Sequence, residues 1–245
     1  KLKHFSQEIK LADRFNYNFN IDSIFTKTEK TILNSEKNPF LRNKELKEIL
    51  KKKYHVDHNN SELDFWIINK WGGIRGFKNT SRNIEKIKNF KKQIIKKKLS
   101  KDSFSTISSL SKVSSFMDPD NFFIYDSRVI YTLNWLILTC ENKSKIREKY
   151  FPLPNGRNKI ISNFDMNTII NIAHISEYEN QESLYLKEQE AYFKYCEFIQ
   201  DSYQKVFDNQ TAPYELEMLL FTIADKEIFK DIKKNINISI KKKSR

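Results

Sequence analysis

Residues 127–139, with the sequence SRVIYTLNWLILT, form a segment that is apolar on nearly every side of a helix. Such a helix has no face to offer to water, so it must lie in the middle of a folded protein with other elements around it. The chain also has only 4 glycines and 5 prolines. Sandwiches and barrels made of many short strands need more turn residues than this. We therefore predict an all-α protein.

Most other segments also have helical spacing. Residues 41–54 and 84–99 place apolar side chains on one face and lysines on the other. We treat residues 1–245 as a single domain of two lobes, with the loop at 152–156 as the boundary between them. Phe15–Phe25 alternates polar and apolar residues, which leaves a minor N-terminal β-sheet open. The remaining predicted helices are 61–71, 104–117, 127–139, 183–207 and 214–229.

The net charge of +13 is concentrated in two stretches. Residues 70–101 carry twelve basic side chains and one acidic one, and residues 226–245 carry eight and two. These stretches contribute +11 and +6, which leaves −4 for the rest of the chain. A compositional bias toward lysine would spread the charge, whereas a phosphate-binding surface concentrates it. We therefore expect a nucleic-acid partner.

Several other classes are excluded. No apolar run reaches the ~20 residues that a membrane-spanning helix requires, and the N-terminus lacks the pattern of a signal peptide. Cys140 and Cys196 are too few for a disulfide framework or an iron–sulfur cluster. The sequence His55-Val56-Asp57-His58 has no third ligand in view. We expect a cytoplasmic monomer without a metal, an iron–sulfur cluster or another cofactor.

The segment 107–136 carries residue types that suit the cleavage of a bond between a sugar and a base. A carboxylate near the sugar C1′ stabilises the positive charge of the transition state or activates water. A lysine at the same place can attack C1′ and form a Schiff base. Asp126 stands where the apolar helix begins, 14 residues after Lys112. These two residues are the candidate catalytic residues.

Base removal also requires a pocket for a base that has left the duplex, with aromatic side chains on which the base stacks. Glycines concentrated in Trp71–Gly76 indicate a sharp turn or a close approach of the backbone. Glu215 and Glu217 open the last helix, where they suit its dipole without any catalytic role. The candidate base-pocket residues are Trp66, Trp71, Phe123 and Tyr125.

The DNA backbone requires donors that hold phosphates without reading the sequence. The serines of 108–111 are interpreted as a turn that leads into a helix N-terminus, where N–H groups and hydroxyls bind a phosphate. The basic face of 84–99 would follow the backbone. The candidate DNA contacts are Arg75, Lys88, Lys91, Lys92, Ser109, Ser111 and Arg128.

The sequence SLSKVSSF, a short loop and then IYDSRV resembles the hairpin, helix, loop and aspartate of the helix-hairpin-helix DNA glycosylases. It is most similar to their 8-oxoguanine-glycosylase-like bacterial and archaeal branch. The resemblance covers 107–136 and implies a helical, two-lobed fold whose hairpin and catalytic core lie in about 104–140. It implies that Asp126 is the catalytic aspartate. The family's lysine maps to Lys112 or, if the alignment shifts by one residue, to Val113.

The resemblance implies an enzyme that flips a base out of double-stranded DNA and hydrolyses its N-glycosidic bond, with strand cleavage if Lys112 is the nucleophile. The substrate stays open between an oxidised purine in repair and a bulky modified pyrimidine in phage DNA, as in antiviral defence. A non-catalytic nucleic-acid-binding module with the same hairpin and basic helix is the main alternative, and an RNA-binding or toxin-like effector is a weaker one. Asp126 would also serve as an ordinary N-cap.

Overall fold

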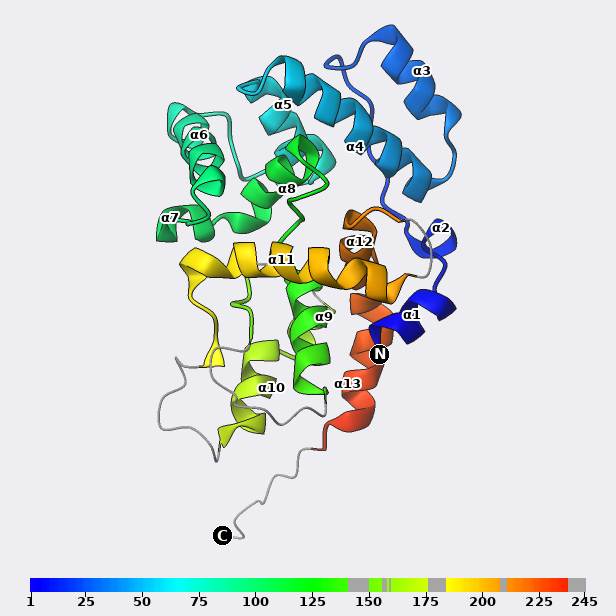
Figure 1. Ribbon diagram of the computed structural model, residues 1–245, viewed down its shortest axis with the longest axis vertical. Coiled ribbons are helices and arrows are strands. Elements are labelled where there is room, and N and C mark those ends of the chain that lie inside the picture. The colour runs from blue at the N-terminus through cyan, green and yellow to red at the C-terminus, as the bar shows by residue number, and fades with distance from the viewer. Residues whose placement is uncertain (141–149, 156–157, 159, 176–183, 208–210, 238–245) are drawn as a thin grey trace, which may run out of the picture.

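The computed structural model describes residues 1–140, 150–155, 158, 160–175, 184–207 and 211–237. Within these ranges every regular element is a helix, which confirms the all-α prediction (Figure 1). Elements η1 and η5 are π-helical, and η2 is a short 3₁₀ turn. The elements are α1 (Leu2–Glu8), α2 (Leu11–Arg14), α3 (Lys27–Ser35), α4 (Pro39–Val56), α5 (Ser61–Phe65), η1 (Trp66–Trp71), α6 (Ser81–Ile95), α7 (Lys101–Phe104), α8 (Ile107–Met117), α9 (Ser127–Leu138), η2 (Ile161–Asn163), α10 (Met166–Ala173), α11 (Glu188–Val206), α12 (Tyr214–Ile223), η5 (Ala224–Ile228) and α13 (Phe229–Asn235).

Polar side chains fix where the main helices begin. Thr26 and Glu29 form a capping box at the start of α3, and Asn38 caps α4 immediately before a proline at its first position. Asp126 caps α9, and Asp165 caps α10. Each of these oxygens accepts a hydrogen bond from a backbone N–H group that has no partner inside its helix.

Helix α9 lies in the centre of its part of the molecule. It packs against α10, α12 and η5, and its residues from Val129 to Leu136 are buried without interruption. The largest of them, Trp135, is 2% exposed and its indole N–H donates to Asp231 of α13 at 2.8 Å. The central position that the apolar sequence predicts is therefore confirmed.

The helices form two groups, which Figure 1 shows one above the other. Helices α3 to α8 lie in the upper group, α9, α10 and α13 lie in the lower one, and α11 crosses between them. The chain passes from one group to the other through 118–126. One buried apolar cluster includes residues from Ile9 to Ile232. The lobe boundary at 152–156 stays a prediction, and Gly156 lies outside the described residues.

The N-terminal β-sheet that alternation left open is absent, because residues 15–25 contain no strand. Phe15 packs edge-on against Phe40, and Phe19 and Phe25 pack against Trp66. The buried side chains of this segment are Phe15, Phe19 and Phe25, which are four and six residues apart, so the alternation in the sequence does not correspond to the period of two of a half-buried strand. In the part of the chain that the structure describes, no helix is long and apolar enough to cross a membrane.

Candidate active site

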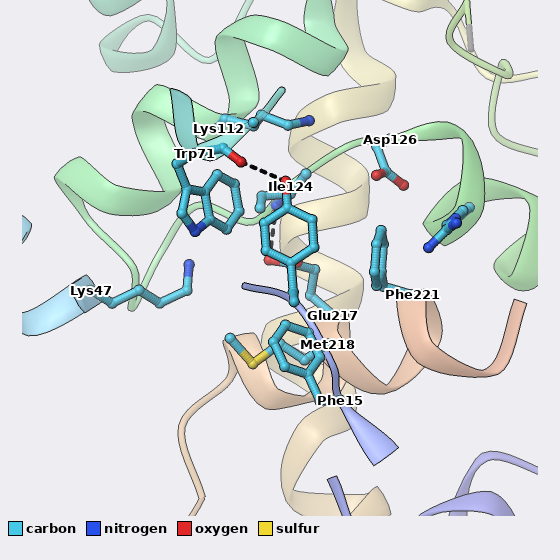
Figure 2. A pocket seen from close by; sticks show the side chains of 12 residues that line it. Phe15, Lys47, Trp71, Lys112, Ile124, Asp126, Glu217, Met218 and Phe221 are labelled. Carbon is cyan, nitrogen blue, oxygen red and sulfur yellow. Dashed lines mark hydrogen bonds between the residues drawn. The ribbon is translucent and has the colours of Figure 1, made fainter. Parts of the chain in front are cut away.

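A pocket of about 230 Å³ lies between the two groups of helices (Figure 2). Its walls come from the N-terminal segment, α4, the end of η1, α8, the start of α9, and α12. Sites for drug-sized ligands usually measure ~300–1,000 Å³, so this pocket suits a small flat group. The lining residues are Phe15, Tyr17, Lys47, Trp71, Gly72, Lys112, Ile124, Asp126, Arg128, Glu217, Met218 and Phe221.

Asp126 lies on the wall of this pocket and is partly exposed. Its Oδ1 accepts a hydrogen bond from the backbone N–H of Val129 at 3.0 Å, which makes it the N-cap of α9. Among the described residues no hydrogen bond reaches Oδ2. Asp126 is thus a helix cap and a pocket residue at the same time.

Lys112 lines the same pocket from α8 and is only 7% exposed. Its Nζ donates to the carbonyl oxygen of Ser108 at 2.7 Å. Burial lowers the pKa of its amine, while the carboxylates of Asp126 and Glu217 act against that change. Figure 2 shows the Lys112 amine extending toward the side of the pocket where Asp126 lies. A lowered pKa increases the fraction of uncharged, nucleophilic amine.

The alternative alignment places Val113 in the nucleophile position. Val113 is fully buried in the core and does not line the pocket. The structure therefore brings Lys112, and not its neighbour, together with Asp126. Whether the two act as catalysts stays a prediction.

Gly72 explains how the backbone comes so close to Lys112. A Cβ atom on Gly72 would lie 2.8 Å from Cδ of Lys112 and 2.7 Å from the carbonyl oxygen of Ile68. The next residue, Gly73, has a φ of +67°, which favours glycine. The close approach and the sharp turn that the glycine-rich segment predicts are both present. This segment follows the π-helical η1, and such elements often occur at functional sites.

Aromatic side chains form another part of the wall. Trp71 is the one predicted base-pocket residue that lines the pocket, and its indole N–H donates to Oδ1 of Asn43 at 2.9 Å. The hydroxyl of Tyr17 donates to the carbonyl oxygen of Trp71 at 2.6 Å. Burial and the charge of Asp126 raise the pKa of Tyr17 to about 12. Phe221 of α12 also lines the pocket.

The other three predicted base-pocket residues lie in the core, so their assignment is wrong. Trp66 packs against Phe19 and Phe25. Phe123 and Tyr125 are fully buried, away from the pocket. In the extended segment before α9, side chains alternate in direction. Ile124 and Asp126 point into the pocket, and their neighbours therefore point into the core.

The serines at 108–111 form no turn, because α8 already begins at Ile107. Ser109 is 7% exposed and Ser111 is fully buried, where its hydroxyl oxygen accepts the backbone N–H of Tyr125 at 3.0 Å. Neither serine can reach a phosphate at the surface. The apolar spacing of Ile107, Leu110 and Val113 continues through the serines, which places them inside the helix.

The predicted basic DNA contacts divide into two sets. Arg75, Lys88 and Lys92 are exposed. Lys91 is 4% exposed, and its Nζ lies 2.8 Å from Oδ2 of Asp64 in a buried ion pair, so its assignment as a DNA contact is wrong. Arg128 pairs with Asp225 at 2.7 Å and lies over the ring of Phe221, at the pocket.

Lys91→Ala is expected to lower the free energy of unfolding by about 3 kcal/mol, because it leaves the Asp64 carboxylate buried without its cation. Lys88→Ala is the matched change on the exposed face and should alter stability by less than about 0.5 kcal/mol. Chemical denaturation measures both. Equal stability of the two variants would contradict the structural role of Lys91.

Sequence reasoning gave no site role to seven of the lining residues: Phe15, Tyr17, Lys47, Ile124, Glu217, Met218 and Phe221. Lys47 is 1% exposed, and its Nζ donates to the carbonyl oxygen of Ser115 at 3.1 Å. Glu217 lies in the first turn of α12, as the sequence predicts, but it is only 4% exposed and lines the pocket. The available signal was an acidic residue inside the apolar run YELEMLLF, since a buried charge rarely occurs without a function or a partner.

Comparisons with protein-family models, curated proteins and solved structures found no match. Among the residues that the structure describes, no three His, Cys, Asp or Glu side chains gather in a way that could hold a metal ion. The chemistry of the pocket is therefore interpreted from its own side chains. They provide a partly exposed carboxylate, two buried amines, a buried carboxyl group and aromatic walls.

Proposed function

We propose that the protein is a DNA glycosylase, which binds double-stranded DNA, takes one base into the pocket and hydrolyses the bond from that base to deoxyribose. The observation that carries the proposal is that Asp126 and Lys112 line one pocket beside Trp71 and Tyr17. A carboxylate, an amine and aromatic surfaces are what this reaction needs in one place.

Asp126 acts on the sugar in this proposal. As the C1′–N bond breaks, its electron pair leaves with the base and positive charge develops on the sugar. The carboxylate stabilises that charge and accepts a proton from the water that adds to C1′. The departing base takes up a proton from solvent, the carboxylate releases the proton that it took from water, and the products are a free base and an abasic site.

Lys112 offers a second route from the same position. Its uncharged amine would attack C1′ as the base leaves, and opening of the sugar ring then gives a Schiff base that leads to strand cleavage. Burial favours the uncharged amine. The two routes differ in whether a covalent intermediate forms.

In this proposal the exposed basic side chains Arg75, Lys88 and Lys92 hold the DNA. Trp71 and Gly72 line the pocket, and the chain continues from them through Arg75 into α6. Lys88 and Lys92 are exposed on that helix. Such a surface binds phosphates without reading sequence, and base recognition is left to the pocket.

The direct experiment incubates the protein with duplex DNA that carries oxidised purines or bulky modified pyrimidines and identifies released bases by mass spectrometry. We expect one free base to appear together with an equal amount of abasic sites. Release of an oxidised purine would indicate repair, and release of a modified pyrimidine would indicate antiviral defence. Tight, salt-sensitive binding to every duplex without release of any base would contradict the proposal and favour a non-catalytic DNA-binding module.

A further inference from the structure

Glu217 provides a buried carboxyl group on the wall of the pocket. It belongs to α12 and is 4% exposed. Its Oε2 accepts the backbone N–H of Ile124 at 3.1 Å, which Figure 2 draws as a dashed line. The pocket lining around it includes Lys47 and Lys112.

The other oxygen of this carboxyl group, Oε1, is free to accept hydrogen bonds. Burial raises the pKa of the Glu217 carboxyl to about 7, although the charges of Lys47 and Lys112 act against that change. Above that pH the group is an ionised carboxylate, which can accept about four hydrogen bonds. Among the described residues, Oε1 accepts none, and neither lysine comes within ion-pair distance of Glu217. Oε1 is also not one of the sealed side-chain atoms that lack a hydrogen bond, so it is open toward the pocket that Glu217 lines. The pocket is the space from which a partner can approach.

We propose that Glu217 reads the base in the pocket and selects bases that carry an exocyclic amino group, by accepting a hydrogen bond from that group through Oε1. This inference rests on the proposed function and adds the class of base to it. It covers amino-bearing pyrimidines and purines alike, and it excludes analogues with a keto oxygen at the same position.

The physical reason is the opposite polarity of the two groups. An amino group donates to a carboxylate, as cytosine N4 does when Glu or Asp reads it. A keto oxygen in its place would face a carboxylate oxygen and leave both acceptors without a donor. A site built to hydrogen-bond one substrate group rejects analogues that lack it much more strongly than an apolar pocket does. Lys47 and Lys112 supply donors for acceptors elsewhere on the same base.

The experiment compares matched substrates on the unchanged protein. The base that is released fastest from duplex DNA is tested against its analogue in which the amino group is replaced by a keto oxygen, such as 5-hydroxymethylcytosine against 5-hydroxymethyluracil or adenine against hypoxanthine. Single-turnover release, measured above the Glu217 pKa of about 7, should be at least about tenfold faster for the amino member. If the fastest base has no amino group, or if the two members react equally, the inference is overturned.

Glu217→Gln then tests the residue itself. A carboxamide has nearly the same shape, and it can donate to a keto oxygen as well as accept from an amino group, so the amino-to-keto ratio should fall about tenfold toward unity. Glu215→Gln is the matched control, because Glu215 is also buried on α12 but pairs with Lys44 and does not line the pocket. That variant should keep the ratio of the unchanged protein.

A third measurement separates base reading from a role in holding the fold. Affinity for a duplex with a stable abasic-site analogue involves no base, so Glu217→Gln should leave it within about twofold. An unchanged amino-to-keto ratio in Glu217→Gln would overturn the inference while base release continued. Absence of base release from the unchanged protein would instead remove the proposed function.

Discussion

Asp126→Asn is expected to slow base release by about 10³-fold, the middle of the range for a positioned acid or base. Asparagine has the same shape but carries no charge, so it can neither stabilise the sugar cation nor accept a proton from water. It is also as good an N-cap as aspartate, and the hydrogen bond from Val129 to the side chain can persist. Single-turnover measurements on the preferred duplex give the rate. Thermal unfolding should show an intact fold.

The control for this change is another helix cap. Asp165 caps α10 through the N–H of Thr168 at 2.8 Å and does not line the pocket. Asp165→Asn should release base at the rate of the unchanged protein. DNA affinity of Asp126→Asn should be the same or slightly tighter, because a negative charge near the phosphates is lost. Undiminished base release by Asp126→Asn would show that Asp126 is only a cap.

Borohydride reduction during turnover is expected to trap a covalent adduct between the protein and DNA, and Lys112→Met should remove it completely. Reduction fixes a Schiff base, which only an amine can form. Methionine is of similar length and apolar, so it can fill the buried space that the lysine stem occupies. Gel electrophoresis measures the adduct, and mass spectrometry of its peptides identifies the modified residue.

Lys47 makes this identification necessary, because it is a second buried lysine on the same wall. Its Nζ donates a hydrogen bond to the carbonyl oxygen of Ser115 and lies over the rings of Phe116 and Tyr214. An adduct on Lys47, or one that survives Lys112→Met, would exclude Lys112 as the nucleophile. If base is released but no adduct forms, Asp126 and water act alone.

Local sequence patterns predicted the central helix and the presence of Lys112 and Asp126 in one pocket. A run that is apolar on all sides has to be buried, and residues on consecutive elements often meet where those elements join. The glycine cluster predicted the close approach that occurs at Gly72, and Trp71 was one of the aromatic residues selected to stack a base. The lysine-rich face of α6 was found through its charge, apart from Lys91.

The rest of the site depends on long-range packing that a local pattern does not contain. Tyr17 and Glu217 are 200 residues apart in the sequence and line the same pocket. In the sequence Lys91 does not differ from the lysines around it, because its ion-pair partner Asp64 belongs to another helix. The serines of α8 predicted a turn because serine side chains often cap helices. In the structure they form hydrogen bonds inside the core instead.

Three consecutive residues ahead of α9 are anchored by three different helices. The backbone N–H of Ile124 donates a hydrogen bond to Glu217 of α12, and that of Tyr125 donates one to Ser111 of α8. The side chain of Asp126 accepts a hydrogen bond from the first turn of α9. The position of the Asp126 carboxylate therefore depends on three helices whose residues lie far apart in the sequence. Under the proposed function, loosening any of these hydrogen bonds should slow base release while the protein is still folded, so base release would detect local defects that thermal denaturation does not.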